Sequence, residues 1–189
     1  MTVEEVIQKT DHIPSSVFQP EQRMWHQVLS PLEGHPVIIE FGTGHGRSAA
    51  TIGLSCPQGT VYTFDPGIPY INGGQNEEEY EADTRKMISM SGATNVIFER
   101  ISNLEKEWTT PIDAINIDSD HSYEQTKDEI NKWIPLLKKG GHAFFHDYGH
   151  PNAPGVKQAI DELIPSKHKM RLEATTPTGP VVQAWFIKE

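Results

Sequence analysis

The sequence predicts a single α/β domain built on a mostly parallel sheet of seven strands, with helices on both faces. Short apolar runs alternate along the 189 residues with segments of helical spacing, as they do in βαβ units. The first five runs are rich in Val, Ile and Phe, which is typical of buried parallel strands. The last two runs are separated by Thr175–Pro180, a turn-forming stretch that is too short for a crossover helix. We therefore expect an antiparallel strand pair at the C-terminal end of the sheet.

Each element follows from its local pattern. The expected strands, in chain order, are Val37–Phe41, Val61–Phe64, Asn95–Phe98, Ala114–Ile117, His142–Phe145, Met170–Ala174 and Val181–Ile187. The expected helices are Glu21–Leu29, one that begins after Gly46, Asn76–Met90, Ser122–Leu137 and Gly155–Ile164. Ser122 and Gln125 predict a reciprocal capping box, and Lys138–Gly141 predicts the end of that helix. Residues 66–76 lack periodicity and are rich in turn formers, so we expect either a lid or a surface excursion there.

The composition narrows the classes of binding partner and the cellular compartment that we expect. Sixteen Lys and Arg against 26 Asp and Glu give a net charge of −10 and an isoelectric point near 5.3. A body this acidic repels phosphate backbones and anionic head groups, so we expect neither nucleic acid nor a membrane as partner. Cys56 is the single cysteine and cannot form an internal disulfide. No apolar run approaches the ~18–20 residues of a membrane span, and the first residues lack the basic start of a secretory signal. We expect a cytoplasmic protein.

A glycine-rich turn follows the first expected strand. Gly42, Gly44 and Gly46 are spaced by two, and the first of them comes two residues after Glu40. A dinucleotide fingerprint places its third glycine five positions after the first, so this tighter turn does not indicate a pyrophosphate site. Asp65 ends the next strand, where an acid can accept both hydroxyls of a ribose. A purely structural glycine turn and a turn-capping aspartate are the alternatives.

This pattern resembles a known cofactor site. Glu40–Ser48 together with Val61–Asp65 resemble the cofactor half of class I S-adenosylmethionine-dependent methyltransferases, which have a Rossmann-like fold. The resemblance implies that the glycine turn wraps the methionine and ribose moieties, that Asp65 binds the ribose, and that the segment after the third strand approaches the adenine. The cofactor-binding residues it implies are Glu40, Gly42, Thr43, Gly44, Gly46, Ser48, Asp65, Ser102, Asn103 and Asp118.

Two polar clusters follow consecutive strands in the second half. Asp118 ends one strand and His121 comes three residues later, while His146 and Asp147 end the next strand. In open α/β sheets ligands bind at the carboxyl ends of the strands. Asp118, His146 and Asp147 could therefore converge on one divalent ion, magnesium or manganese. Helix N-terminal acids and a surface ion pair are the alternative interpretation.

The second half is also similar to a particular family, the macrocin-type O-methyltransferases, which include sugar and natural-product O-methyltransferases and cephalosporin-hydroxylase-like proteins. The matching motifs are Asp118–Tyr123, Trp133–Gly141, His146–Tyr148 and Pro154–Val156. The resemblance implies that Asp118 is a metal ligand, that His121 is the general base, and that the pair matching His146 and Asp147 completes the metal site. The sequence departs from the family at His146, where characterised members carry a glutamate.

Together these features predict an S-adenosylmethionine-dependent, metal-assisted O-methyltransferase that acts on a hydroxyl of a sugar or natural-product small molecule. Residues 1–35 would form an N-terminal helical cap and substrate segment, and residues 36–189 the catalytic core. Three rival functions stay open at this point: a non-catalytic S-adenosylmethionine-binding or assembly protein, a nicotinamide-dependent oxidoreductase, and a hydroxylase of the same family. The sequence also leaves open whether the protein forms a homo-oligomer.

Overall fold

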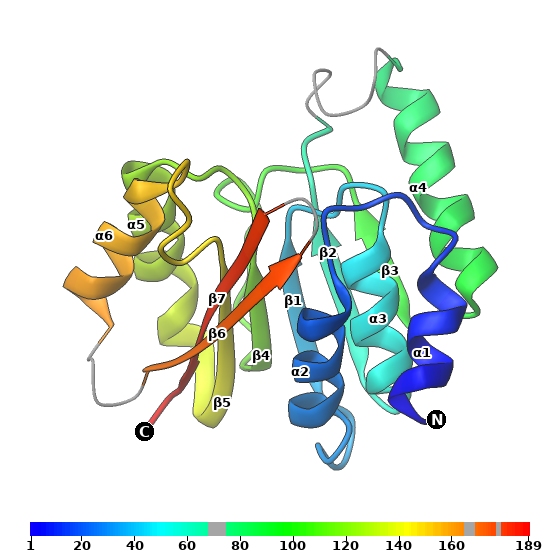
Figure 1. Ribbon diagram of the computed structural model, residues 1–189, viewed down its shortest axis with the longest axis horizontal. Helices are drawn as coiled ribbons and strands as arrows, with labels where there is room; N and C mark the ends of the chain where they lie inside the picture. The colour runs from blue at the N-terminus through cyan, green and yellow to red at the C-terminus, as the bar shows by residue number, and fades with distance from the viewer. Residues whose placement is uncertain (68–74, 165–168, 177–178) are drawn as a thin grey trace. The chain divides into compact units, whose positions relative to one another are not determined.

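The computed structural model describes residues 1–67, 75–164, 169–176 and 179–189 (Figure 1). These residues divide into two compact units, Met1–Ser102 and Asn103–Glu189. Most of the 66–76 segment lies outside the described residues, so its role as a lid or surface excursion stays a prediction. Its last residue, Asn76, caps the following helix.

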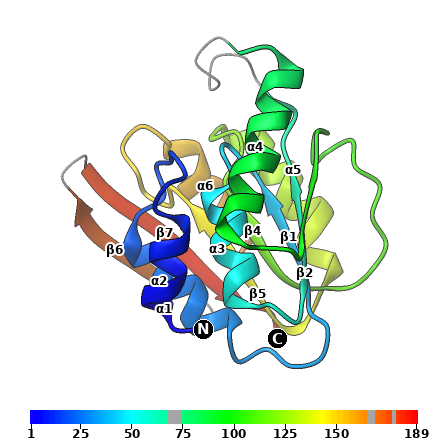
Figure 2. The same ribbon diagram turned by 90° about the vertical axis from the view of Figure 1, so that its right-hand side faces the viewer.

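The first unit contains three parallel strands in the order β3-β2-β1. They are β1 (Val37–Phe41), β2 (Thr60–Phe64) and β3 (Val96–Glu99), joined through the helices α3 (Arg47–Ser55) and α4 (Glu77–Ser91). Phe41 is paired with Phe64, so the residues that follow them, Gly42 and Asp65, leave the sheet at the same edge. This register places the glycine turn beside the expected ribose-binding acid. Figure 2 shows α4 alongside α3.

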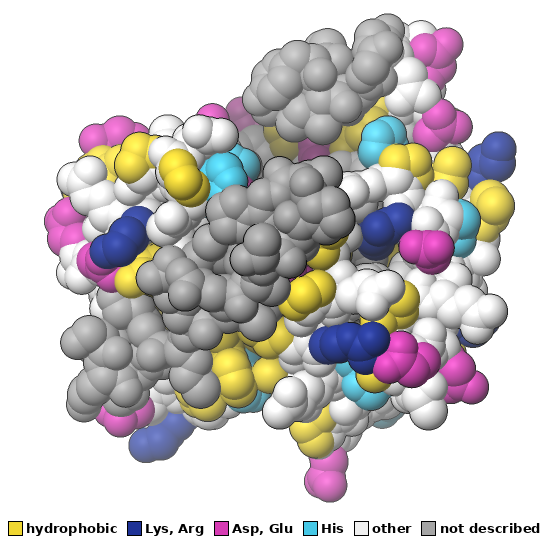
Figure 3. All heavy atoms as spheres, viewed as in Figure 1, with side chains coloured by type: hydrophobic (Ala, Val, Ile, Leu, Met, Phe, Trp, Pro, Cys, Tyr) yellow, Lys and Arg dark blue, Asp and Glu magenta, His cyan; other side chains and the backbone are white. Residues whose placement is uncertain are grey.

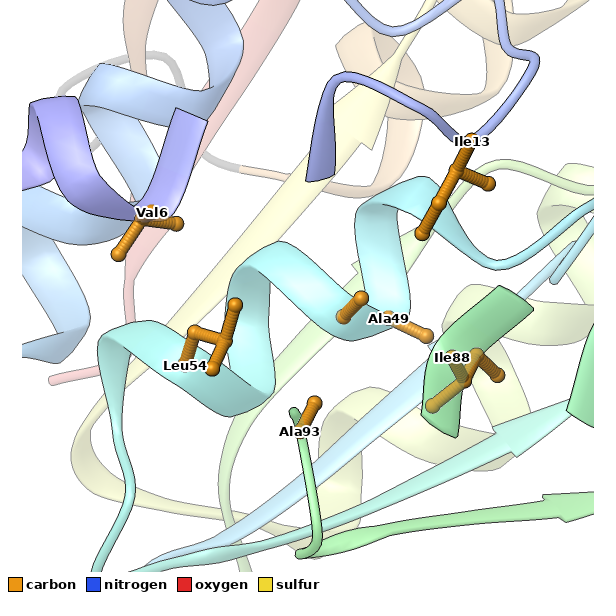
Figure 4. Packing of buried hydrophobic residues seen from close by; sticks show 7 residues of the cluster. Val6, Ile13, Ala49, Leu54, Ile88 and Ala93 are labelled. Carbon is orange, nitrogen blue, oxygen red and sulfur yellow. The ribbon is translucent and has the colours of Figure 1, made fainter. Parts of the chain in front are cut away.

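Two helices precede β1. They are α1 (Val3–Thr10), which the sequence pattern did not predict, and α2 (Gln19–Leu29). Val6 and Ile13 belong to a buried cluster with residues of α3 and with Ile88 of α4 (Figure 4). The Arg47 guanidinium donates to the carbonyls of Asp11 (2.8 Å) and Val17 (3.3 Å). The N-terminal segment is therefore fixed onto the helix that begins at the glycine turn.

The second unit contains four strands in the order β4-β5-β7-β6. They are β4 (Ile112–Ile117), β5 (Leu137–His146), β6 (Lys169–Thr176) and β7 (Gly179–Ile187). β4 and β5 are parallel, whereas β7 is antiparallel to both β5 and β6, which confirms the predicted C-terminal pair. The helices α5 (Tyr123–Trp133) and α6 (Pro154–Leu163) lie side by side (Figure 1).

The structure corrects the predicted end of the helix after Ser122. The helix stops at Trp133, and Ile134–Leu136 form a 3₁₀ turn, because Pro135 cannot continue an α-helix. β5 then begins at Leu137, five positions before the predicted His142. The Lys138–Gly141 stretch is thus strand rather than helix end, and Gly140 adopts a φ of 79° within it.

Half of the predicted capping box forms. The Ser122 hydroxyl accepts a hydrogen bond from the backbone N–H of Gln125 at 3.3 Å. The Gln125 side chain, however, donates to Glu129 and Asn103 instead of reaching back to the helix start. A tertiary hydrogen-bond network therefore overrides the local capping pattern.

Charged side chains of both signs lie on the described surface. Basic and acidic side chains are interspersed over the described part of the face in Figure 3, without a broad field of one sign. None of the helices among the described residues combines the length and the apolar character that a membrane crossing needs.

Candidate functional site

The glycine turn of the first unit adopts a backbone that side chains other than glycine rarely tolerate. Gly42, Gly44 and Gly46 have φ values of 80°, 51° and 92°. A Cβ atom on Gly46 would lie 2.5 Å from Cγ1 of Ile88 on α4. The turn is thus closely packed from one side by α4, and its geometry depends on the glycines.

Asp65 stabilises the glycine turn through two hydrogen bonds from the backbone. One carboxylate oxygen accepts the N–H of Gly44 at 3.0 Å, and the other accepts the N–H of Gly67 at 2.7 Å. Each oxygen has a second lone pair, so these bonds leave Asp65 able to accept ribose hydroxyls as well. The side chain is buried. Asp65 therefore shapes the loop in addition to any role in binding.

Two residues of α4 hold the carbonyl of the same glycine, and the sequence did not point to them. The Tyr80 hydroxyl donates to the Gly44 carbonyl at 2.8 Å, and the Thr84 hydroxyl donates to it at 3.0 Å. Burial, reinforced by the charge of Asp65, raises the pKa of Tyr80, so this hydroxyl stays a neutral donor. No local pattern in an acidic amphipathic helix reveals such a long-range contact.

Glu40 lies deeper than the glycine turn. Its buried carboxylate accepts a hydrogen bond from the Thr63 hydroxyl at 2.6 Å, and the Thr63 oxygen lies 2.6 Å from that of Thr43. Glu40 thus acts on the turn through a chain of hydroxyls. Ser48, also buried, lies in the first turn of α3. The structure gathers these predicted residues of the first unit at one end of β1 and β2.

The second unit brings together the four side chains of the predicted chemical site. Asp118, His121, His146 and Asp147 each offer one ligand atom, and these atoms all lie within 4.8 Å of one another. Ile117 is paired with Phe145 in the parallel β4–β5 ladder, so Asp118 and His146 leave neighbouring strands at equivalent positions. The sheet register therefore assembles the cluster.

Both imidazoles contact the same two carboxylates. His146 Nδ1 lies 3.2 Å from Asp118 Oδ1 and 3.2 Å from Asp147 Oδ2. His121 Nε2 lies 3.1 Å from Asp147 Oδ2 and 3.5 Å from Asp118 Oδ1. The two histidines differ in exposure, because the side chain of His121 is 45% exposed and that of His146 only 11%. His121 is thus the outer member of the cluster and His146 the inner one.

The electrostatics of the cluster favour a cation. The hydrogen bond to Asp118 raises the pKa of His121, and the charges of Asp118 and Asp147 act in the same direction against burial. Burial alone would raise the pKa of Asp147, but the hydrogen bond from His146 and the nearby histidines outweigh it and lower that pKa. Two carboxylates this close together need positive charge between them.

Asp147 has an unusual backbone. Its φ of 58° is the one positive value among the described residues other than glycine. Aspartate is among the few residue types that enter this region, and such strain is concentrated at functional sites. The carbonyl of Asp147 accepts the N–H of His150 at 2.9 Å, which closes the turn after β5. The turn directs the carboxylate toward the histidines.

The donor set fits a divalent metal ion. Carboxylate oxygens suit magnesium and manganese, and imidazole nitrogens favour transition metals. Two carboxylates and one or two imidazoles therefore match manganese better than magnesium.

Comparison with known proteins identifies the family. The model of a methyltransferase domain family matches residues 39–148, a range that includes the glycine turn and the whole cluster. The chain belongs to this methyltransferase family. No curated protein matches the sequence.

Solved structures share the fold of this methyltransferase. The O-methyltransferase TomG from Streptomyces achromogenes, involved in tomaymycin synthesis and solved with SAM, gives a TM-score of 0.67 at 16% identity, over 99% of this chain and 88% of its own. An O-methyltransferase from Bacillus cereus in complex with SAH gives a TM-score of 0.68 at 16% identity, over 98% of this chain and 90% of its own. CalS11, a TDP-rhamnose 3′-O-methyltransferase of calicheamicin biosynthesis, gives a TM-score of 0.66 at 18% identity, over 88% of this chain and 77% of its own. At these identities the likeness establishes a common fold.

Asn103 of the methyltransferase, which was predicted to approach adenine, is buried and anchored within the second unit. Its side-chain amide donates to Glu129, and its side-chain oxygen accepts from Gln125 at 3.3 Å. Ser119 and Gln125 donate to the same oxygen of Glu129. Burial raises the pKa of Glu129. Nothing in the sequence distinguishes this acid, because its helical position resembles that of any other acidic residue. Ser102 is half-buried beside Asn103 in the chain.

Proposed function

We propose that this methyltransferase uses S-adenosylmethionine and a divalent metal ion to methylate a hydroxyl group of a sugar or natural-product small molecule. The observation that carries the proposal is the Asp118–His121–His146–Asp147 cluster in a chain of the methyltransferase family. In this cluster two imidazoles contact the same two carboxylate oxygens. The O-methyltransferases that share the fold support the choice of oxygen as the acceptor atom.

The first unit would bind the cofactor. Structural neighbours hold SAM and SAH, which supports assigning the same ligand here. The assigned residues are Glu40, Gly42, Thr43, Gly44, Gly46, Ser48 and Asp65, together with Ser102, Asn103 and Asp118 from the later segments. When bound, S-adenosylmethionine supplies an electrophilic methyl group on a sulfonium. The contribution of the chain is alignment, because the glycine turn is rigidly held by Asp65, Tyr80 and Thr84.

The second unit would activate the acceptor. Asp118, His146 and Asp147 would hold the metal ion, which would polarise the acceptor hydroxyl. His121 would take the proton, and its greater exposure supports this division of roles. With Nε2–H donated to the carboxylates, Nδ1 of His121 carries the lone pair that accepts the proton. A positioned base of this kind contributes about 10²–10⁴-fold to the rate.

A surface hollow supports the choice of a polyhydroxylated acceptor. It has a volume of 360 Å³ and lies on the segment directly after Asp147. Its lining residues are Gly149, His150, Pro151, Pro154, Lys157 and Gln158. Three of these side chains can donate hydrogen bonds to hydroxyl oxygens. CalS11 acts on TDP-rhamnose, so a sugar hydroxyl is the acceptor class to test first. We also assign residues 1–35 to acceptor selection.

A metal titration tests the proposal. Manganese is titrated by calorimetry into protein saturated with S-adenosylhomocysteine, using wild type, Asp147→Asn and the matched control Asp113→Asn, whose carboxylate pairs with Lys138 instead. We expect saturable binding in wild type and in the control and none in Asp147→Asn, with S-adenosylhomocysteine affinity equal in all three. Equal manganese affinity in all three proteins would remove the metal site from the mechanism.

An activity measurement completes the test. Transfer of a labelled methyl group from S-adenosylmethionine to nucleotide-linked sugars and glycosylated natural products is measured with manganese and with EDTA. We expect transfer to at least one hydroxyl acceptor that EDTA abolishes. Transfer that persists in EDTA would leave an O-methyltransferase that depends on His121 alone.

A further inference from the structure

Glu129 is a fully buried acid of α5. Its side chain is 0% exposed, and no Lys, Arg or His side chain forms an ion pair with it among the described residues. Burial disfavours the charged form of a carboxyl group, and a buried acid without a cation contributes little to stability. What Glu129 contributes therefore lies in the groups that it holds in place.

Three side chains donate hydrogen bonds to a single oxygen of Glu129. Oε1 accepts from the amide of Asn103, the hydroxyl of Ser119 and the amide of Gln125, the last at 2.9 Å. Asn103 is the first residue of the second unit, and Ser119 directly follows Asp118 after the end of β4. One buried atom thus joins two segments that are distant in the sequence.

The two segments depend on Glu129 to different degrees. Trp133 Nε1 donates to the Asn103 carbonyl at 3.2 Å, and Gln125 Nε2 donates to the side-chain oxygen of Asn103 at 3.3 Å. The Ser119 hydroxyl, by contrast, makes its one hydrogen bond among the described residues with Glu129. Loss of the Glu129 acceptor would therefore leave Asn103 partly held and release the Ser119 hydroxyl.

Ser119 is the chain neighbour of a central member of the cluster. Asp118 Oδ1 lies 3.2 Å from His146 Nδ1 and 3.5 Å from His121 Nε2. The position of the Asp118 carboxylate follows from the backbone after β4, which the Ser119–Glu129 hydrogen bond ties to α5. A misplacement of about 1 Å at a reacting site can cost about 10²-fold in rate, so a bond that fixes this backbone matters for the site.

We propose that Glu129 is a positioning residue that holds Asn103 directly, and Asp118 through Ser119, in the arrangement that binds S-adenosylmethionine. The assignment of Asn103 and Asp118 to this cofactor rests on the proposed function, whereas the hydrogen bonds do not. The role needs one oxygen that faces three donors. The amide oxygen of a glutamine can take the same place, but the thioether of a methionine is only a weak acceptor.

Binding of S-adenosylhomocysteine to the full chain, measured by calorimetry in EDTA, tests this role. We expect Glu129→Met to raise the dissociation constant at least about fivefold, the scale of one lost hydrogen bond. Glu129→Gln keeps an acceptor oxygen and should stay within about twofold of wild type. The matched control Asp128→Asn, which changes the exposed acid beside Glu129, should equal wild type.

A double-mutant cycle shows whether Glu129 acts through Ser119. Ser119→Ala alone should also weaken the binding of S-adenosylhomocysteine. Added to Glu129→Met it should weaken binding little further, because both changes break the same hydrogen bond. Fully additive effects of the two changes would contradict the action through Ser119.

Hydrogen exchange of the ligand-free chain gives a readout that needs no cofactor. The amides of residues 118–121 should exchange faster in Glu129→Met and Ser119→Ala than in wild type, Glu129→Gln and Asp128→Asn, because the backbone after β4 is no longer tied to α5. Exchange rates or S-adenosylhomocysteine affinities that are equal in wild type, Glu129→Met and Ser119→Ala would overturn the role of Glu129. A wild-type protein that binds no S-adenosylhomocysteine would overturn the proposed function instead, and the exchange rates would still decide the hydrogen bond. Ser119→Ala decides both measurements where Glu129→Met does not fold.

Discussion

At the scale of single residues, the cluster of the second unit distinguishes two histidines that the sequence presents alike. Both imidazoles contact Asp118 Oδ1 and Asp147 Oδ2, but His146 ends a buried strand and His121 precedes an exposed helix start. A buried nitrogen between two carboxylates suits a fixed ligand. An exposed imidazole that contacts the same carboxylates can reach a bound acceptor and release its proton to solvent.

Replacing His121 separates the roles of base and ligand. We expect His121→Ala to lower kcat by about 10²–10⁴-fold, because the proton acceptor is lost. Its manganese affinity should stay within about threefold of wild type, because the inner ligands are kept. Initial rates and calorimetry on the same preparation check both values. A loss of manganese binding that parallels the loss of rate would make His121 a ligand instead.

At the scale of elements, α4 acts as a support for the glycine turn. Tyr80 and Thr84 bind the Gly44 carbonyl, and Ile88 occupies the space where a Gly46 side chain would lie. The first unit thus ties the geometry of its loop to a helix more than thirty residues away in sequence.

A pair of glycine substitutions measures that support. Gly34 and Gly46 both have positive φ, but a Cβ on Gly34 meets nothing within 4 Å. Gly34→Ala should therefore destabilise by about 1–2 kcal/mol, the cost of the backbone conformation alone. Gly46→Ala should add about 1–3 kcal/mol for overpacking against Ile88. Urea unfolding measures the free energy of unfolding of both variants. Equal losses of stability would show that Ile88 and α4 move aside without an energetic penalty.

The β5–β7 ladder makes stability depend on pH. Burial lowers the pKa of His142, and Trp185 Nε1–H donates to its Nδ1 at 3.2 Å, which requires the neutral ring. The unfolded chain takes up this proton near pH 6.5, and the folded chain only at lower pH. The stabilisation from His142 is therefore complete above about pH 6.5 and is lost as the pH falls from there toward the folded-state pKa.

Replacing the titrating ring should flatten that dependence. We expect the Tm of His142→Gln to fall less than that of wild type between about pH 7.5 and about pH 5. His35→Gln, which replaces an exposed histidine of the first unit, should follow the wild-type curve. Thermal unfolding by circular dichroism at a series of pH values measures the slopes, and identical slopes for all three proteins would contradict the assignment.

At the scale of the whole molecule, local pattern was enough to predict which segments form strands and that the last two strands are antiparallel. Apolar runs mark buried strands, and the polar residues that follow them sit where parallel strands finish. The start of β5 was not predictable, because Pro135 ends the helix early and Gly140 sits inside a strand. Tyr80 and Glu129 were missed for a different reason. Their contacts come from helix packing, which joins residues far apart in sequence.

The left-handed backbone of Asp147 restricts which amino acids can serve at that position. Glycine and asparagine adopt the conformation readily, but neither supplies a negative charge. Glutamate supplies the charge, but it pays the steric penalty of the left-handed region and would carry its carboxylate one methylene further from the β5 turn. Of the two acidic side chains, aspartate alone meets both demands. The backbone of the turn, as much as the chemistry of the ligand, therefore selects the residue at this corner of the site.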